Sequence, residues 1–218
     1  FSPAALNYCI NEKLNDSTFD QTFISYHGVF EIQEELNGLK FNISPKSFFQ
    51  TNPVQAEKLY QVALDFAEIT KNDVVYDLYC GTGTITCLAA KKAKKAIGVE
   101  IVDEAIQAAN VNANLNQLTN TTFLVGDMKD VFNTTFYDQH GQPDVIITDP
   151  PRSGMHPSVV AYLAEIKCPK IVYVSCNPAT QARDLAMLTE VYQVNKSQAV
   201  DMFPQTHHVE NVVLLSLR

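Results

Sequence analysis

DLYCGTG, residues 77–83, is the most informative stretch of this chain. It directly follows an apolar run that starts at Val74, and helical periodicity resumes near residues 84–93. Glycines at a strand-to-helix junction let the main chain turn tightly and approach a ligand beside the helix N-terminus. In open parallel sheets such ligands lie beyond the carboxyl ends of the strands. The stretch therefore predicts a ligand-binding crevice at the end of the first strand of a larger sheet.

Strand and helix patterns alternate beyond this stretch. The apolar segments that predict strands are Val74–Tyr79, Ala96–Val99, Thr122–Val125, Val145–Thr148 and Ile171–Ser175. Helical patterns lie between them, near 84–93, 103–115, 157–166 and 179–190, and two further strands follow, near 192–200 and 209–217. Alternation with short connections indicates an α/β fold with a parallel, doubly wound sheet. Five such units followed by a closing pair of strands are the outline of the seven-stranded methyltransferase fold, but periodicity alone does not separate it from other nucleotide-binding folds.

The first part of the chain has a different pattern. Short alternating segments at Thr22–Tyr26 and Leu39–Ile43, interrupted by Asn, Asp and Gly, predict small antiparallel strands. From Pro53 to Ala67 apolar residues recur at helical spacing, with the proline at the first turn. We expect a small β-rich appendage at residues 1–46 and the main domain at residues 47–218.

Composition limits the class of protein. The chain has 218 residues, 46% of them hydrophobic, which suits one substantial domain. No apolar run reaches the roughly 20 residues that span a bilayer. Five cysteines without a CxxC pair argue against a disulfide framework or zinc site and favour the reducing cytoplasm. The chain starts at Phe1 without a signal-peptide pattern, so we expect a piece of a longer protein.

The net charge of −8 argues against a nucleic-acid partner, because phosphates favour basic surfaces. One basic cluster, at residues 91–95, fits either a solvated helix end or an RNA contact. An RNA-binding module elsewhere in the protein would resolve this conflict.

Acidic residues follow the next two predicted strands. Glu100 ends IGVE, nineteen residues after Gly81, where a carboxylate can accept both ribose hydroxyls of an adenosine. Asp127 ends VGD and can accept an adenine amino group. A dinucleotide site needs a small residue where Thr86 stands, and Asp77 would repel a pyrophosphate. Asp77 suits the cationic methionine end of S-adenosylmethionine better, so this is the cofactor that we expect.

Two later motifs carry reactive groups. In DPPRSG (149–154) the prolines hold the loop after Asp149 rigid. Its fourth residue is Arg152 where enzymes that methylate amino groups carry an aromatic ring, which argues against an exocyclic nitrogen as target. Cys176, in VSCNPATQARDL (174–185), lies between a strand and a helix, and a helix N-terminus favours a thiolate.

A third motif, DMFPQTHHVE (201–210), precedes the last strand. Partial burial of Glu210 would raise its pKa and suit it to proton abstraction. His207 and His208 would point in opposite directions in an extended segment, so we expect no shared metal site.

Together these motifs and SFFQTNP (47–53) resemble the RNA uracil-C5 methyltransferases of the RumA/TrmA type. The likeness extends over residues 44–210, and the general run of the sequence is more similar to the branch that acts on 23S ribosomal RNA. The resemblance implies a class I methyltransferase fold with residues 47–218 as the catalytic domain. Cys176 matches the nucleophile, Glu210 the general base and Asp149 a carboxylate beside cofactor and base. Cofactor-contacting positions of the family match Gln50, Tyr79, Thr84, Glu100, Asp127 and Asp149; Asp77 and Gly81 complete our predicted cofactor site.

The resemblance also implies features without a counterpart in this chain. Family members usually carry an N-terminal TRAM domain, and some hold a four-iron cluster on cysteines. We expect neither domain nor cluster in this stretch, a monomer in the cytoplasm, and an RNA partner. Alternatives are transfer RNA as substrate, a cytosine-C5 enzyme, a catalytically dead RNA-binding relative, and an NAD-dependent oxidoreductase. The oxidoreductase would leave Cys176 and the DPPRSG motif unexplained.

Overall fold

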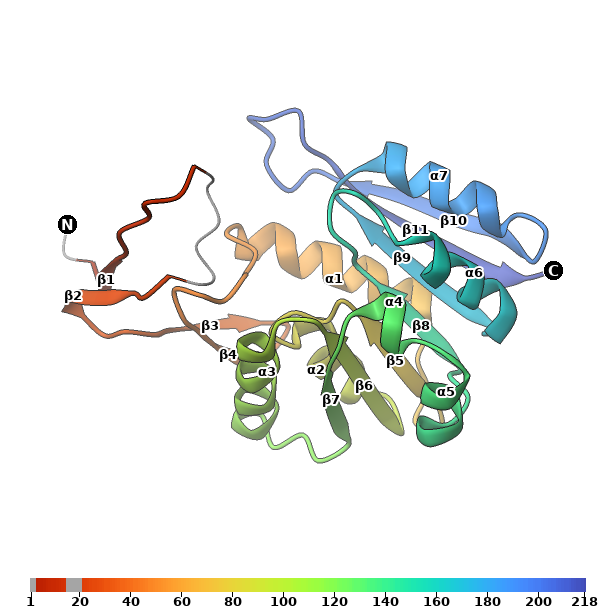
Figure 1. The fold of residues 1–218 in the computed structure, drawn as a ribbon, viewed down its shortest axis with the longest axis horizontal. Coiled ribbons are helices and arrows are strands. Elements are labelled where there is room, and N and C mark those ends of the chain that lie inside the picture. Colours follow the sequence, from red (N-terminus) through yellow and green to blue (C-terminus); the bar gives the residue numbers. More distant parts are fainter. Residues whose placement is uncertain (1–2, 15–20) are drawn as a thin grey trace.

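The computed structural model describes residues 3–14 and 21–218. Seven strands form one sheet in the spatial order β10-β11-β9-β8-β5-β6-β7 (Figure 1). They are β5 (Val74–Leu78), β6 (Lys95–Glu100), β7 (Thr121–Val125), β8 (Val145–Thr148), β9 (Lys170–Ser175), β10 (Tyr192–Val200) and β11 (Glu210–Leu217). Neighbours from β7 to β9 pair in parallel, whereas β11 is antiparallel to both β9 and β10.

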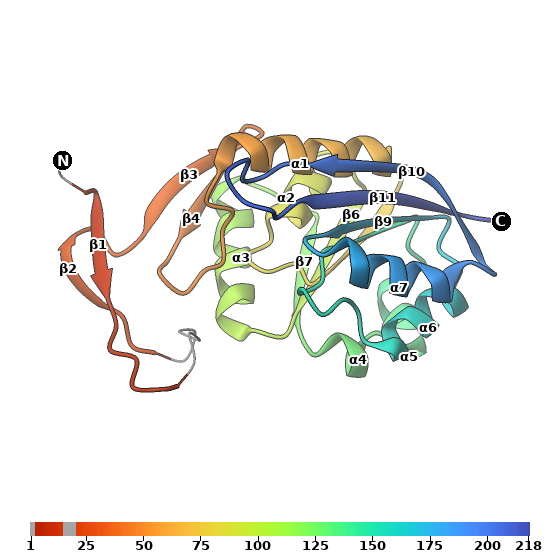
Figure 2. The same cartoon turned by 90° about the horizontal axis from the view of Figure 1, so that it is seen from above.

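Helices cover both faces of this sheet (Figure 2). They are α1 (Pro53–Ala67), α2 (Thr84–Ala90), α3 (Asp103–Leu115), α4 (Met128–Val131), α5 (Thr134–His140), α6 (Pro157–Ile166) and α7 (Pro178–Leu188). Alternate strand residues enter two separate hydrophobic cores: Val172 and Val174 pack with α1 and α2, whereas Ile171 and Tyr173 pack with α6 and α7. A strand buried on both faces must be apolar at every position, which explains the continuous apolar runs.

The predicted seven-stranded, mostly parallel α/β sheet is confirmed. The second predicted helix is shorter than expected, because α2 ends at Ala90 and residues 91–94 form a turn. The helices α4 and α5 were not predicted, since four and seven residues are too few for a clear helical period.

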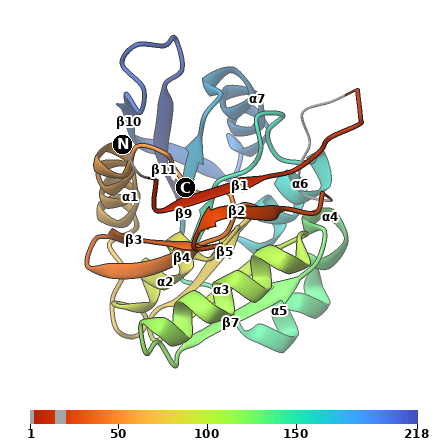
Figure 3. The ribbon, with the colours of Figure 1, turned by 90° about the vertical axis from the view of Figure 1, so that its left-hand side faces the viewer.

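Two hairpins precede the sheet. The first joins β1 (Ala5–Tyr8) to β2 (Ile24–Gly28), and the second joins β3 (Ile32–Leu36) to β4 (Leu39–Ile43), as Figure 3 shows from the side. Every residue of β2 is exposed, whereas Leu36 and Phe41 are fully buried and belong to the core around α1. The second hairpin is therefore part of the main core, and the first is not.

No helix in residues 3–14 and 21–218 is long and apolar enough to cross a bilayer.

Candidate active site

The chain turns sharply at the end of β5. Tyr79, Gly81 and Gly83 all have left-handed backbone conformations, with φ of 66°, 52° and 80°. The predicted strand therefore ends one residue early, at Leu78, because Tyr79 leaves extended geometry. A Cβ on Gly83 would stand 2.8 Å from Cβ of Ala109, so a larger residue would push α2 away from α3. These constraints fix the loop at the carboxyl edge of the sheet.

Glu100 holds this loop from the neighbouring strand. Its Oε2 accepts the Gly81 N–H at 3.2 Å, and its Oε1 accepts the N–H groups of Ile101 and Val102 at 2.8 and 3.1 Å. The carboxylate is thereby fixed at the end of β6, and four lone-pair directions leave capacity for a ligand hydroxyl.

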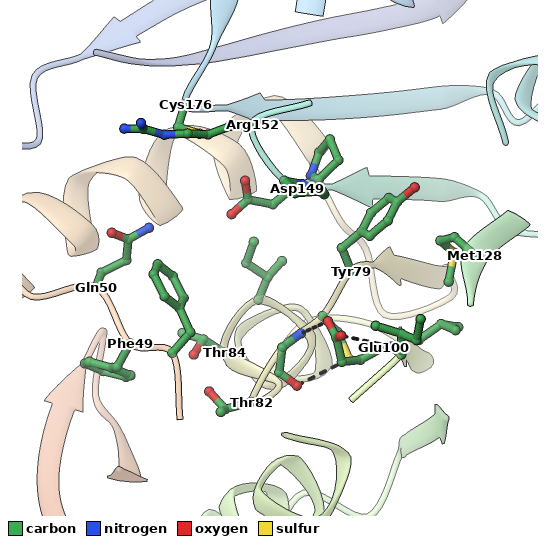
Figure 4. Close-up of a pocket in the computed structure, with 18 of the residues that line it drawn as sticks. Phe49, Gln50, Tyr79, Thr82, Thr84, Glu100, Met128, Asp149, Arg152 and Cys176 are labelled. Carbon is green, nitrogen blue, oxygen red and sulfur yellow. Dashed lines mark hydrogen bonds between the residues drawn. The ribbon is translucent and has the colours of Figure 1, made fainter. Parts of the chain in front are cut away.

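A cavity of about 860 Å³ opens beyond the carboxyl ends of β5, β6 and β8 (Figure 4). It reaches from Glu100 at one end to Cys176 and Arg152 at the other, and the Asp149 carboxylate projects into its middle. The predicted cofactor-binding residues that line it are Gln50, Tyr79, Gly81, Thr84, Glu100, Asp127 and Asp149. Cys176 and Glu210 line the same cavity, so one space is bordered by both groups of predicted site residues.

Asp77, the remaining predicted cofactor-binding residue, is not among the residues that line this cavity. Its side chain is 1% exposed, and its Oδ2 accepts a hydrogen bond of 2.5 Å from Oγ1 of Thr86. Burial raises the pKa of Asp77 to about 7, against the opposing hydrogen bond. Its Oδ1 is buried without a partner among the described residues. An unsatisfied, partly ionised carboxyl next to the cavity fits a ligand that carries a positive charge, because such a charge would lower its pKa.

Asp127 is at the far end of the cavity. Its side chain accepts the N–H of Lys129 at 3.2 Å and thereby caps the short helix α4. A hydrogen bond from the Lys129 ammonium lowers the pKa of Asp127, so the residue presents a carboxylate at neutral pH.

Two strands place Cys176 beside Glu210. Ser175 on β9 pairs with Asn211 on β11, and each reactive residue is one position beyond this pair. Gln181 of α7 locks the arrangement: its Nε2 donates to the carbonyls of Tyr173 and Asn211 at 2.9 and 3.1 Å, and its Oε1 accepts from Nδ2 of Asn211 at 2.7 Å. The buried side-chain amide of Gln181 thus connects α7 with the strand before Cys176, β9, and the strand that starts at Glu210, β11.

The loop after Asp149 is tied to the loop after Cys176. The carbonyl of Arg152 accepts from Nδ2 of Asn177 and from Oγ1 of Thr180, both at 3.1 Å. The side chain of Arg183 donates to the carbonyl of Ser153 at 2.9 Å and pairs with Asp184. These contacts hold the Arg183 guanidinium against the loop that follows Asp149.

The two carboxyl groups at the Cys176 end of the cavity have raised pKa values. Burial raises the pKa of Asp149 well above its usual range, and the nearby Glu210 and Asp77 raise it further. Burial also raises the pKa of Glu210, whereas Arg152 lowers it. The expected direction for Glu210 is therefore confirmed.

The expected direction for Cys176 is wrong. Burial, followed by the charge of Glu210, raises the pKa of its thiol above the usual value, and Arg152 opposes this rise. The helix N-terminus was expected to lower the pKa, but desolvation and two carboxyl groups outweigh it. The thiol therefore depends on Arg152 as its neighbouring cation.

A second cavity of about 330 Å³ borders the first at Cys176 and Arg152. His207 and His208 line it, and the Arg152 guanidinium contacts the His208 ring at 3.2 Å. The histidines do not point in opposite directions: their ring centroids are 4.1 Å apart, because the segment before β11 turns instead of extending. No cluster of three His, Cys, Asp or Glu side chains that could hold a metal occurs in the part of the chain that the structure describes.

Comparison with known proteins agrees with this geometry. The profile of the family described as tRNA (Uracil-5-)-methyltransferase matches residues 17–218. The chain belongs to this family. An RNA methyltransferase of Porphyromonas gingivalis is 55% identical over 213 residues, which are 97% of this chain and 46% of the relative. One of Bacteroides thetaiotaomicron is 53% identical over 98% of this chain and 47% of its own length. The chain thus spans about half the length of the curated family members that it matches.

Solved structures give the same fold. The tRNA (uracil-54, C5)-methyltransferase of Pyrococcus abyssi, in complex with S-adenosyl-L-homocysteine, is 34% identical with a TM-score of 0.81. The match covers 99% of this chain and 51% of that one. A tRNA m1G37 methyltransferase of M. jannaschii, 16% identical over 91% of this chain and 61% of its own, has a TM-score of 0.65 and shares the fold. The class I methyltransferase fold expected for this family member is confirmed.

Sequence reasoning missed Tyr60, Gln181 and Asp184. All three are buried, at 7%, 2% and 1% exposure. A polar residue inside an apolar helical face was the available signal, and it occurs at Tyr60 within the pattern of α1.

Proposed function

We propose that this chain is the catalytic part of an enzyme that transfers a methyl group from S-adenosylmethionine to C5 of a uridine in RNA. The observation that carries the proposal is the register that puts Cys176 and Glu210 one step beyond the Ser175–Asn211 pair, in one cavity with Asp149. Membership of the family supports it.

The cavity suits the cofactor. Glu100 offers a fixed carboxylate for ribose hydroxyls. The buried Asp77, whose Oδ1 has no partner among the described residues, favours a ligand with a positive charge nearby. The relative from Pyrococcus abyssi was solved with S-adenosyl-L-homocysteine. When bound, S-adenosylmethionine supplies the methyl group as an electrophile on its sulfonium.

The reaction needs a nucleophile and a base on the same face of the cavity. The Cys176 thiolate forms a bond to C6 of uracil, and the C5=C6 electron pair moves toward C4 and O4, which makes C5 nucleophilic. After methylation Glu210 takes the C5 proton. The released electron pair restores C5=C6 and expels Cys176 as thiolate. Asp149 accepts the N3–H of the base and orients it.

The target nucleotide must leave any helical stack to enter this cavity. Phe48, Phe49 and Phe203 line the cavity, and Phe48 is 73% exposed. We propose that these rings contact the extruded base or its neighbours. For the RNA class we retain 23S ribosomal RNA as the prediction, with transfer RNA as the second candidate because the Pyrococcus abyssi relative acts on it.

The test uses ribosomal and transfer RNA transcripts that contain 5-fluorouridine. Fluorine cannot leave as a proton does, so the Cys176 adduct should accumulate as a covalent protein–RNA band in the presence of S-adenosylmethionine. The band should vanish in Cys176→Ala and persist in Glu210→Gln and in the control Cys9→Ala. A methylated product without any adduct would refute the covalent mechanism, and the class of transcript trapped identifies the substrate.

A further inference from the structure

The hydroxyl of Tyr60 has no explained role in the reaction above. Tyr60 lies on α1 and is only 7% exposed, yet it lines the large cavity together with Asp149 and Glu210. No residue within the described ranges forms a hydrogen bond with its hydroxyl, whereas the buried Tyr76, Tyr173 and Tyr192 all donate to protein oxygens. A phenol hydroxyl that lines a cavity and bonds no protein group is free to donate to a ligand in that cavity.

We propose that the Tyr60 hydroxyl donates a hydrogen bond to O4 of the target uracil, which makes Tyr60 a specificity-determining residue. This inference rests on the proposed uracil C5 chemistry and deepens it. The residues assigned to the reaction above act on N3, C5 and C6 of the base, and Tyr60 gives O4 a hydrogen-bond partner.

The positions of the reacting groups support O4 over the other base atoms. Along the edge of uracil the order is N3, C4 with its oxygen O4, C5 and C6. Asp149 serves N3, Glu210 serves C5 and Cys176 serves C6, so the remaining place between Asp149 and Glu210 belongs to O4.

The charges near Tyr60 are consistent with a hydrogen-bond donor at the O4 position. Burial raises the pKa of Tyr60 far above its usual value, and the charges of Asp149, Asp77 and Glu210 raise it further. The charges of Asp149 and Glu210, the two groups assigned to N3 and C5, therefore both act on Tyr60. Both effects favour the neutral phenol, which is the form that donates a hydrogen bond.

A donor at O4 has two chemical consequences. Addition of Cys176 to C6 moves negative charge onto O4, and a preorganised donor stabilises this charge more strongly than the neutral carbonyl. Addition of Cys176 to C6 of cytosine would place the negative charge on N3 instead, where the Tyr60 hydroxyl provides no donor, so Tyr60 would stabilise the uracil adduct selectively. Tyr60 thus contributes both to rate and to the choice of uracil.

The first test compares wild type, Tyr60→Phe and the control Tyr162→Phe, which removes a phenol hydroxyl on α6. The substrates are ribosomal and transfer RNA transcripts labelled with tritium at C5 of uridine. Tritium release without S-adenosylmethionine reports Cys176 addition and C5 exchange, and release with it reports turnover. Tyr60→Phe should lower both rates about 10²-fold to 10³-fold, the loss typical of one oxyanion donor. Tyr162→Phe should match wild type.

Two readouts separate this role from a structural or cofactor-binding one. Tyr60→Phe should leave the melting temperature unchanged, since the hydroxyl bonds no group of the described residues, and should keep the affinity for S-adenosylhomocysteine within about twofold. With 4-thiouridine transcripts, whose sulfur accepts hydrogen bonds weakly, wild type and Tyr60→Phe should differ less than about threefold.

The outcomes are distinct. Equal tritium release from wild type and Tyr60→Phe overturns the inference while the proposed function stands. A tenfold loss of S-adenosylhomocysteine affinity with normal tritium release would assign the hydroxyl to the cofactor instead. Absence of tritium release and methylation by wild type on every transcript defeats the proposed function, and the inference with it.

Discussion

At the residue scale, the pKa of the Cys176 thiol depends on the neighbouring Arg152. Burial and the carboxyl group of Glu210 raise the thiol pKa, and Arg152 lowers it. The thiolate must therefore form in a site that is already rich in acidic groups, next to a guanidinium that also borders the second cavity.

Alkylation measures this balance. The rate at which iodoacetamide modifies Cys176, followed by mass spectrometry of its peptide, should rise with pH and reach half its maximum above the pH of a free cysteine thiol, about 8.5. Arg152→Met should shift the profile further upward, and the remote Lys196→Met should not. A midpoint below that of free cysteine would contradict the raised pKa.

Asp77 links the site to stability. Its folded-state pKa of about 7 exceeds its usual value of 3.8, so protonation favours the folded state. The favourable contribution is complete below about pH 4 and is lost as the pH rises toward 7. Asp77→Asn abolishes this titration but can still accept the Thr86 hydrogen bond. The unfolding free energy of Asp77→Asn minus that of wild type should therefore increase between pH 4 and 7, by on the order of a few kcal/mol. The difference between the two melting temperatures should increase in the same direction. The exposed Asp138→Asn is the control variant, and a flat difference for Asp77→Asn would refute the raised pKa.

At the scale of elements, α7 organises the site through Asp184. This buried carboxylate accepts hydrogen bonds from the Met155 N–H and the Tyr173 hydroxyl, both at 2.8 Å, and pairs with Arg183. It joins α7, β9 and the loop that follows Asp149, so the geometry of two reactive residues depends on it.

Asp184→Ala leaves three donors without their acceptor. We expect it to lower the unfolding free energy by about 3 kcal/mol in urea titrations, and to reduce methylation even where the variant is folded. Tyr173→Phe, which removes one of these donors, should cost about 1 kcal/mol. Equal effects of the two variants would show that the carboxylate contributes no more than a single hydrogen bond.

On the scale of the whole molecule, the two hairpins differ in their relation to the core. The fully exposed β2 and its partner β1 extend away from the sheet (Figure 1), whereas Leu36 and Phe41 are completely buried in the hydrophobic core that also contains residues of α1. The division at residue 46 remains a prediction, and the packing suggests that folding depends on residues before it.

Deletion tests this dependence. Removal of residues 1–30 should change the melting temperature of the remaining chain by only a few degrees, because none of the described residues before Leu36 belongs to either hydrophobic core. Phe41→Ala in the full chain should instead cost about 3 to 5 kcal/mol of unfolding free energy. Loss of the cooperative thermal transition after the deletion would show that the first hairpin is required.

The order of strands and helices followed from local pattern. A strand buried on both faces must be continuously apolar, and an amphipathic helix must repeat every 3.6 residues, so the elements from β5 to β11 could be predicted from the sequence. The same holds for reactive residues that end strands, since parallel strands bring their carboxyl ends to one edge. The short helices α4 and α5 carry too few residues for such a signal.

The pKa values and the hydrogen-bond partners of the site residues depend on neighbours that are distant in the sequence. They could be assigned only from the folded structure. The pKa of Cys176 reflects burial and the charge of Glu210, which a strand pairing brings beside it from 34 positions away. Tyr60 is an ordinary helix residue until folding brings it to the cavity that Asp149 and Glu210 also line. Local periodicity encodes which elements form, but desolvation and charge act through space, so only packing determines what the side chains of this site can do.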